Sequence, residues 1–264
     1  MPTLTVDGVE LYYEIHGDDA AAPLVFVNGI FQDTTGWSLH VRRFADRRCL
    51  VYDCRGQGRS AKPAGPHRIE QHSNDLLSLL DALRIDRADV VGLSNGGAVA
   101  MTFAATNPAR IARLVLVDTY AYADAALRAK LRSWEAALDV GGPGLRFDVA
   151  VPWNFSRAFL EQHARDLPLL RQIALALDAD AMRALMAGSS AHDARTLLPR
   201  ITARTLVLVG AEDVLAPPWT AREIADAIPN ADLQMIAGAG HAMAIERLDE
   251  FCDALRRFFD REVH

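Results

Sequence analysis

Residues 90–101 read VVGLSNGGAVAM and place Ser94 between glycines, directly after one apolar run and before another. Ser94 is the centre of a Gly-x-Ser-x-Gly pattern with Gly92 and Gly96, a pattern that many chains contain by chance. Its position at the end of a buried strand and the start of a helix favours a nucleophile-bearing turn. Such a turn brings the residues two before and two after the serine together, so both must be small.

Similar apolar runs recur on both sides of this stretch. Short runs at 23–29, 49–54, 113–119 and 205–213 are typical of buried parallel strands. The segments 34–45, 68–83 and 95–108 carry apolar residues at three- and four-residue spacing, which predicts helices. Alternating strands and helices predict an α/β fold, with a doubly wound, mostly parallel sheet and helices on both faces.

Two regions depart from this rhythm. At the start of the chain, Asp7-Gly8 separates two β-rich runs and predicts a hairpin from Val6 to Val9. Residues 119–204 are rich in Ala, Leu and Arg and contain no convincing strand, although GGPG at 141–144 indicates a break, either a hinge or a turn between helices. We therefore expect a core formed by 1–118 and 205–264, and an inserted helical cap formed by 119–204, over the edge where open α/β folds bind ligands.

The composition excludes several classes of protein. With 264 residues, of which 50% are hydrophobic, the chain can bury the core of a single domain. The net charge of -6 comes from interspersed charges without a basic block, so we expect no nucleic-acid partner. No secretory signal or membrane span is evident, which predicts a cytoplasmic protein. We expect a monomer or homodimer. Three cysteines match neither a disulfide framework nor a zinc site, and a reactive Cys54 is the less favoured alternative to a reduced thiol.

A serine hydroxyl becomes a good nucleophile only when a base removes its proton, so a histidine and a carboxylate are expected near Ser94. Asp213 follows the apolar run that begins at Thr205, and His241 lies in the glycine-rich segment 237–243 after the next predicted strand. Both would reach the same sheet edge as Ser94. Asp118 also ends a predicted strand and is the alternative acid.

The other histidines lie mostly in helical or terminal stretches, where a solvated surface position is the default. They are His16, His40, His67, His72, His163, His192 and His264. An oxyanion hole needs two backbone donors. We expect the N–H groups of Ile30, after the strand that ends near residue 28, and of Asn95.

With Ser94, Asp213 and His241 in this order, the chain resembles the α/β-hydrolase superfamily over nearly its whole length. The segment DCRGQGRS at 53–60 resembles the family's D-x-R-G-x-G-x-S motif. The resemblance implies the α/β-hydrolase fold, with a mostly parallel eight-stranded sheet. The most similar group contains small capped esterases, enol-lactonases, carbon-carbon bond hydrolases and cofactor-free haloperoxidases. Relatives usually carry His-Gly where this chain has Asn28-Gly29, which predicts an altered oxyanion loop.

The resemblance implies a serine esterase that acts on a small to medium, largely apolar ester, lactone or thioester without a metal or organic cofactor. Carbon-carbon bond cleavage, lyase, cyclase or acyl-transfer chemistry with the same triad is the alternative, followed by a non-catalytic binding protein. Arg157 is a further candidate for a substrate carboxylate, although a solvated position is favoured. The predicted substrate-binding residues are Phe31, Trp37, Trp134, Trp153, Phe155 and Trp219, and Phe159 adds to the apolar character of the cap.

Overall fold

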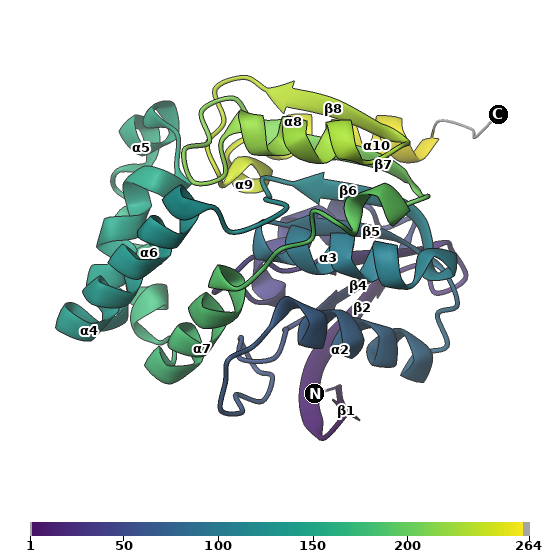
Figure 1. The fold of residues 1–264 in the computed structure, drawn as a ribbon, viewed down its shortest axis with the longest axis horizontal. Coiled ribbons are helices and arrows are strands. Elements are labelled where there is room, and N and C mark those ends of the chain that lie inside the picture. Colours follow the sequence, from purple (N-terminus) through teal and green to yellow (C-terminus); the bar gives the residue numbers. More distant parts are fainter. Residues whose placement is uncertain (1, 261–264) are drawn as a thin grey trace.

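The computed structural model describes residues 2–260 and contains, within that range, one eight-stranded sheet with helices on both faces (Figure 1). The strand order is β1-β2-β4-β3-β5-β6-β7-β8, and all pairs are parallel except β1 with β2 and β2 with β4. The predicted α/β fold is confirmed. The strands are β1 (Thr3–Val6), β2 (Val9–Gly17), β3 (Pro23–Val27), β4 (Arg48–Tyr52), β5 (Ala88–Leu93), β6 (Ile111–Val117), β7 (Arg204–Gly210) and β8 (Ala231–Ile236).

The predicted hairpin joins β1 to β2. Val6 pairs with Val9 in antiparallel register, and Asp7 and Gly8 form the turn with φ values of +46° and +77°. Both turn residues therefore lie in the left-handed region, as a two-residue hairpin turn requires. The antiparallel start of the sheet is confirmed.

Alternate residues of the central strands point to opposite faces of the sheet and form two cores. On one face, Val25 and Val90 pack with α2, α3 and α8. On the other, Phe26 and Val91 pack with α1, α9 and α10. The helices of these two layers are α1 (Ser38–Arg43), α2 (Ile69–Ala82), α3 (Asn95–Thr106), α8 (Pro218–Ala227), α9 (Met243–Glu246) and α10 (Leu248–Asp260), with short 3-10 turns at Thr34–Trp37, Pro108–Arg110 and Leu198–Arg200.

Four helices occupy the interval between β6 and β7 and lie beside one end of the sheet, at the left of Figure 1. The first of them is interrupted at Gly141 and Gly142, where the backbone leaves the helical region and Gly142 has a φ of +67°. The GGPG segment is thus a break between two helical stretches. The four helices are α4 (Ala125–Asn154), α5 (Arg157–His163), α6 (Leu167–Leu175) and α7 (Ala179–Ser190), and we call them the cap.

The expectation that most of the remaining histidines are solvated is wrong. The side chains of His40, His67, His72 and His192 are buried. His40 lies on α1 and His72 on α2, whereas His67 and His192 lie in loops. Neither ring nitrogen of His72 or His192 has a hydrogen-bond partner among residues 2–260. Burial lowers the pKa of His72 to about 3 and that of His192 to about 4. His264 lies outside the described residues.

These two buried histidines predict a loss of stability in acid. Between pH 4 and the usual histidine pKa of 6.5, the unfolded chain binds protons that the folded chain does not. The free energy of unfolding therefore decreases as the pH falls through this range. We expect a loss of about 2 kcal/mol per histidine between pH 7 and pH 5. Urea unfolding at both pH values measures it, and His192→Phe should lose about 2 kcal/mol less than the wild type. An equal loss in both proteins would contradict this origin.

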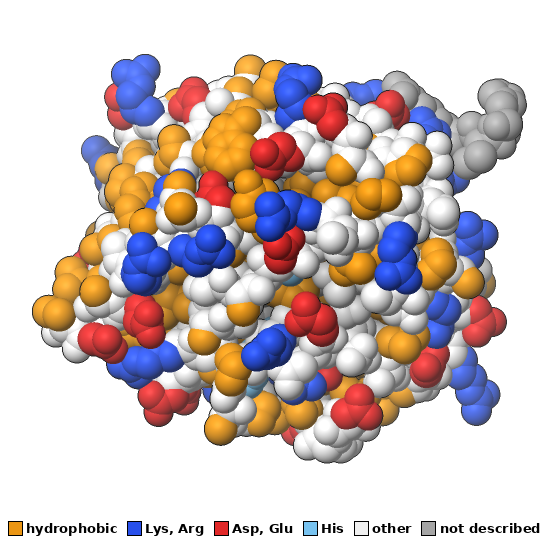
Figure 2. Space-filling model, viewed as in Figure 1, with side chains coloured by type: hydrophobic (Ala, Val, Ile, Leu, Met, Phe, Trp, Pro, Cys, Tyr) orange, Lys and Arg blue, Asp and Glu red, His pale blue; other side chains and the backbone are white. Residues whose placement is uncertain are grey.

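Other features bear on partners and location. Within residues 2–260, no helix combines the length and apolar character needed to cross a membrane. No group of three His, Cys, Asp or Glu side chains in that range is arranged to hold a metal ion. On the face shown in Figure 2, basic and acidic side chains are interspersed.

The three cysteines are buried and unbridged. Burial raises the pKa of the Cys54 thiol to about 12, which disfavours the reactive-thiol alternative.

Candidate active site

Ser94 occupies the sharp turn between β5 and α3. Its φ of +53° and ψ of -118° are unusual for a residue with a side chain and indicate strain at a functional position. Two hydrogen bonds to the end of β6 hold this conformation. The Ser94 N–H donates to the carbonyl of Val117 (2.8 Å), and the Ser94 carbonyl accepts from the Thr119 hydroxyl (2.6 Å). The turn therefore projects the serine above the carboxyl end of the parallel strands.

The glycines on either side of Ser94 are required by close backbone contacts. A Cβ atom on Gly92 would lie 2.4 Å from the carbonyl oxygen of Gly96. A Cβ atom on Gly96 would lie 2.2 Å from the carbonyl oxygen of Val27 and 2.5 Å from that of Asn28. Backbone atoms cannot move aside cheaply, so the predicted need for small residues at both positions is confirmed.

We expect Gly96→Ala to damage both stability and activity. The added methyl group must push α3 away from the β3 end that carries the Asn28-Gly29 loop, at a cost of about 1–3 kcal/mol. The same displacement separates Ser94 from that loop. Chemical unfolding and esterase assays measure the two effects, and Gly36→Ala is the matched control for stability because nothing beyond its own chain neighbours lies within 4 Å of its added Cβ. Similar losses of stability in both variants would contradict the contact argument.

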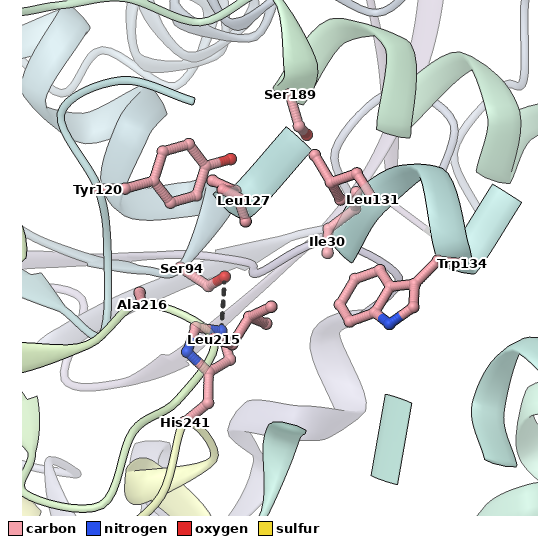
Figure 3. Close-up of a pocket in the computed structure, with 10 residues that line it drawn as sticks. All are labelled: Ile30, Ser94, Tyr120, Leu127, Leu131, Trp134, Ser189, Leu215, Ala216 and His241. Carbon is pink, nitrogen blue, oxygen red and sulfur yellow. Dashed lines mark hydrogen bonds between the residues drawn. The ribbon is translucent and has the colours of Figure 1, made fainter. Parts of the chain in front are cut away.

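His241 connects Ser94 to Asp213 through two hydrogen bonds. Its Nε2 atom lies 2.9 Å from Ser94 Oγ, and its Nδ1 atom lies 2.8 Å from Asp213 Oδ2 (Figure 3 shows the first). Because a carboxylate can only accept, Nδ1–H donates to Asp213 and leaves Nε2 to accept the serine proton. The other Asp213 oxygen accepts the backbone N–H groups of Leu215 and Ala216 (2.8 and 2.9 Å). The carboxylate is thus fixed in place.

Asp118 lies nearby but takes no part in this hydrogen-bonded line. Its Oδ1 accepts the backbone N–H of Gly210 (2.8 Å), and its Oδ2 has no partner among residues 2–260. Complete burial, followed by the negative charge of Asp213, raises the pKa of Asp118 well above its usual value. Asp213, and not Asp118, lies within hydrogen-bond distance of His241 Nδ1 (2.8 Å), so the geometry favours Asp213 as the acid.

The loop after β3 is held by side-chain amides. Asn28 donates through Nδ2 to the carbonyl of Tyr52 (2.9 Å) and accepts through Oδ1 from Trp37 Nε1 (2.7 Å). Gln57, from the 53–60 segment, donates to the carbonyl of Gly29 (2.8 Å). Asn28 therefore supports the loop with two hydrogen bonds and contributes no titratable group.

The two expected oxyanion donors flank Ser94. Ile30 lines the same small pocket as Ser94 and His241, and Asn95 is the first residue of α3. No atom of residues 2–260 accepts a hydrogen bond from the backbone N–H of either residue. Both donors are thus available to a ligand, and the amino end of α3 favours negative charge there.

The side chain of Asn95 links the oxyanion region to the cap, a connection that the sequence did not indicate. Its Oδ1 accepts from Ser189 Oγ of α7 (2.7 Å) and from the Tyr120 hydroxyl (3.2 Å). Figure 3 shows Tyr120 and Ser189 on one side of Ser94. Glu246 makes a second link, because it accepts the N–H of Gly240 (3.1 Å) in the histidine loop and that of Ser156 (3.0 Å) in the cap.

Two adjoining pockets open at Ser94 and His241. The smaller has about 10 Å³, enough for roughly one water molecule, and lies between Tyr120, Ser189 and the apolar side chains of α4 (Figure 3). The larger has about 300 Å³ and extends under α6. Three predicted substrate-binding residues line the larger pocket, namely Phe31, Trp134 and Phe155. Trp134 also lines the smaller one.

The other predicted substrate-binding residues lie elsewhere, and these assignments are corrected. Trp37 is 2% exposed and packs in the core against Phe26, where its indole N–H serves Asn28. Trp219 is 46% exposed at the start of α8 and lines neither pocket. Trp153 stacks on Trp134 (6.0 Å between ring centres), behind the pocket wall. Three of the six predicted aromatic residues thus line the larger pocket, and the other three pack or lie elsewhere.

Two further cap residues also lie away from the pockets. Phe159 stacks on Phe155 with 5.0 Å between the ring centres and lines neither pocket. The side chain of Arg157 is 84% exposed and lies 3.5 Å from Glu161. The solvated interpretation of Arg157 is therefore correct.

The chain is similar to known proteins over nearly its full length. The sequence profile of the alpha/beta hydrolase fold family matches residues 22–248. A putative carbamate hydrolase, RutD, from Caulobacter vibrioides is 30% identical over 97% of each chain. The 3-oxoadipate enol-lactonase 2 of Acinetobacter baylyi is 26% identical over 98% of this chain and 96% of its own length.

A solved structure gives the same result. The enol-lactonase from Burkholderia xenovorans LB400 is 31% identical, covers 98% of this chain and 100% of its own, and superposes with a TM-score of 0.92. Its match extends over the sheet and the cap alike. Together with the family profile and the sheet order, this similarity shows that the chain belongs to the alpha/beta hydrolase family and is a hydrolase.

Proposed function

We propose that the protein is a serine hydrolase that cleaves a carboxylic ester, lactone or thioester through an acyl-enzyme on Ser94. The observation that carries this proposal is the continuous line from Ser94 Oγ to His241 (2.9 Å) and from His241 to Asp213 (2.8 Å). This arrangement gives a serine, a base and an orienting carboxylate in hydrogen-bond reach, which nucleophilic catalysis requires.

The reaction uses each group in turn. His241 takes the Ser94 proton while Ser94 Oγ attacks the carbonyl carbon, and Asp213 stabilises the resulting imidazolium ion. The Ile30 and Asn95 N–H groups bind the oxyanion of the tetrahedral intermediate. His241 then protonates the leaving oxygen or sulfur, and a water molecule deprotonated by His241 releases the acyl group. None of these steps requires a metal ion or an organic cofactor.

The pockets support a substrate with one small and one larger, mostly apolar part. The pocket beside Tyr120 and Ser189 holds about 10 Å³, whereas the pocket beside Phe31 and Phe155 holds about 300 Å³. The names of the relatives describe hydrolysis of a carbamate and of an enol lactone, and both compounds carry a carbonyl bonded to a heteroatom. A test panel therefore contains aryl esters, lactones, thioesters and a carbamate, with a vinylogous diketone to detect carbon-carbon bond cleavage.

Labelling with a fluorophosphonate probe tests the nucleophile directly. Wild-type protein should become labelled, and Ser94→Ala should not. Ser133→Ala is the matched control, because Ser133 lies on α4, bonds only to the carbonyl of Lys130 (2.8 Å), and lines neither pocket. An unlabelled wild type would overturn the proposal, and so would hydrolysis of the diketone alone.

A further inference from the structure

Arg146 is a buried cation without a partner in the wall of the larger pocket. It lies on α4 after the break at Gly142, and only 4% of its surface is exposed. Its Nε has no hydrogen-bond partner, and no carboxylate within residues 2–260 forms an ion pair with its guanidinium group. The same cavity of about 300 Å³ also contacts Ser94 and His241.

The acidic residues near Arg146 are engaged by other groups. Asp148, on the same helix, accepts from Arg171 (2.9 Å), and Asp139 accepts from Arg183 (2.7 Å). Asp33 lines the same cavity, and one of its carboxylate oxygens, Oδ1, accepts both the N–H and the hydroxyl of Thr35 (2.9 and 2.5 Å). No side-chain carboxylate in the described part of the chain forms an ion pair with Arg146.

Aromatic rings hold the guanidinium group at the cavity. Its central carbon lies 4.6 Å from the centre of the Phe31 ring and 5.9 Å from that of Trp134. Such stacking uses the face of the guanidinium and leaves the N–H groups at its edge for a ligand. The Oδ1 atom of Asn154, also in the cavity wall, is buried without a hydrogen-bond partner. The cavity thus presents two polar groups that nothing in residues 2–260 satisfies.

The environment of Arg146 differs from that of the other buried arginine. Arg55 makes two bonds of 2.6 and 2.5 Å to Asp75, which satisfy its charge within the core. Burial lowers the pKa of Arg146 to about 10, so the group is still cationic at neutral pH. A buried charge without a counter-ion opposes folding, and an arginine at such a position fits a binding role better than a structural one.

We propose that Arg146 binds a carboxylate of the substrate, so that the enzyme prefers esters, lactones or thioesters with an acidic group remote from the scissile carbonyl. This inference rests on the proposed function, because it places the acyl carbonyl at Ser94 in the same cavity. A carboxylate accepts two parallel N–H bonds from a guanidinium group, which fixes the orientation of the substrate as well as its charge. The apolar walls of the cavity would contact the carbon chain between the two groups.

Paired substrates test the inference. Mono-p-nitrophenyl adipate and p-nitrophenyl hexanoate have acyl chains of equal length and differ in a terminal carboxylate. We expect wild-type kcat/KM to favour the adipate ester, and Arg146→Met to reduce that preference by about 10- to 100-fold with little loss on the hexanoate ester. Arg146→Lys should retain part of the preference. The control Arg157→Met, on the exposed face of α5, should behave as the wild type.

The outcomes separate this inference from the proposed function. Methionine fills a similar volume and removes a buried charge, so Arg146→Met should fold and melt at a temperature equal to or above that of the wild type. Two outcomes overturn the role of Arg146 and leave the proposed function standing. One is a wild type that fluorophosphonate labels but that does not prefer the adipate ester, and the other is an Arg146→Met variant that keeps the preference. If no ester is cleaved, thermal shift with adipate decides: it should stabilise the wild type and not Arg146→Met, and equal shifts overturn the inference.

Discussion

Ser94→Ala is expected to lower kcat for the best ester substrate by about 10⁵-fold or more, because the variant retains the oxyanion donors but has no atom to acylate. Steady-state kinetics with an aryl ester measure the loss. KM should change much less than kcat, since the serine hydroxyl contributes little to ground-state binding. The fold should be unaffected because the positive φ at this position already strains the native serine as much as an alanine.

A second measurement separates chemistry from binding in this variant. Ser94→Ala should still bind a product analogue with wild-type affinity, because the walls of both pockets are intact. A variant that retains more than about one thousandth of wild-type kcat would show that another group performs the attack, since serine-hydrolase triads lose far more than this when the nucleophile is removed.

Asp213→Asn is expected to reduce kcat by about 10³- to 10⁴-fold. The side-chain amide that replaces the carboxylate either donates a hydrogen bond to His241 Nδ1 or accepts one from it. It carries no charge to stabilise the imidazolium ion. The backbone N–H groups of Leu215 and Ala216, which bond to Asp213 Oδ1, can still bond to the amide oxygen, so the loop should keep its shape. Circular dichroism and a kcat measurement check the two parts of this prediction.

Asp118→Asn is the matched comparison for Asp213→Asn. Burial and the nearby charge of Asp213 hold the pKa of Asp118 well above its usual value, and an amide keeps the shape of the group without a charge. The amide oxygen can still accept the N–H of Gly210. We expect only a few-fold change in kcat. A larger loss in Asp118→Asn than in Asp213→Asn would make Asp118 the acid.

Much of this architecture could be predicted from the sequence because local patterns encode it. Continuous apolar runs marked the central strands, and Gly92 and Gly96 marked the turn that only small side chains can fill. Ser94, Asp213 and His241 each follow a strand, so a parallel sheet brings all three to one edge. The hydrogen-bond distances between them are what the structure adds.

Other features depend on packing between distant segments and have no local signal. Trp37 and Trp219 have the same chemistry as Trp134, and only the three-dimensional structure separates a core ring, a surface ring and a pocket ring. Arg146 is one of many arginines in the cap. What distinguishes it is burial without an acidic partner within residues 2–260, which no sequence spacing reveals. His72 lies in an amphipathic helix where a solvated position is equally compatible with the pattern.

The central claim is that Ser94 carries an acyl group during turnover, and trapping this intermediate tests it most directly. Wild-type enzyme mixed with excess p-nitrophenyl ester and acid-quenched within the first turnovers should gain the mass of one acyl group. Peptide mapping should place that group on the segment that contains Ser94, and Ser94→Ala should gain none. Two results would contradict the account. One is a burst of nitrophenol release with no gain in protein mass, and the other is an acyl group on a residue other than Ser94.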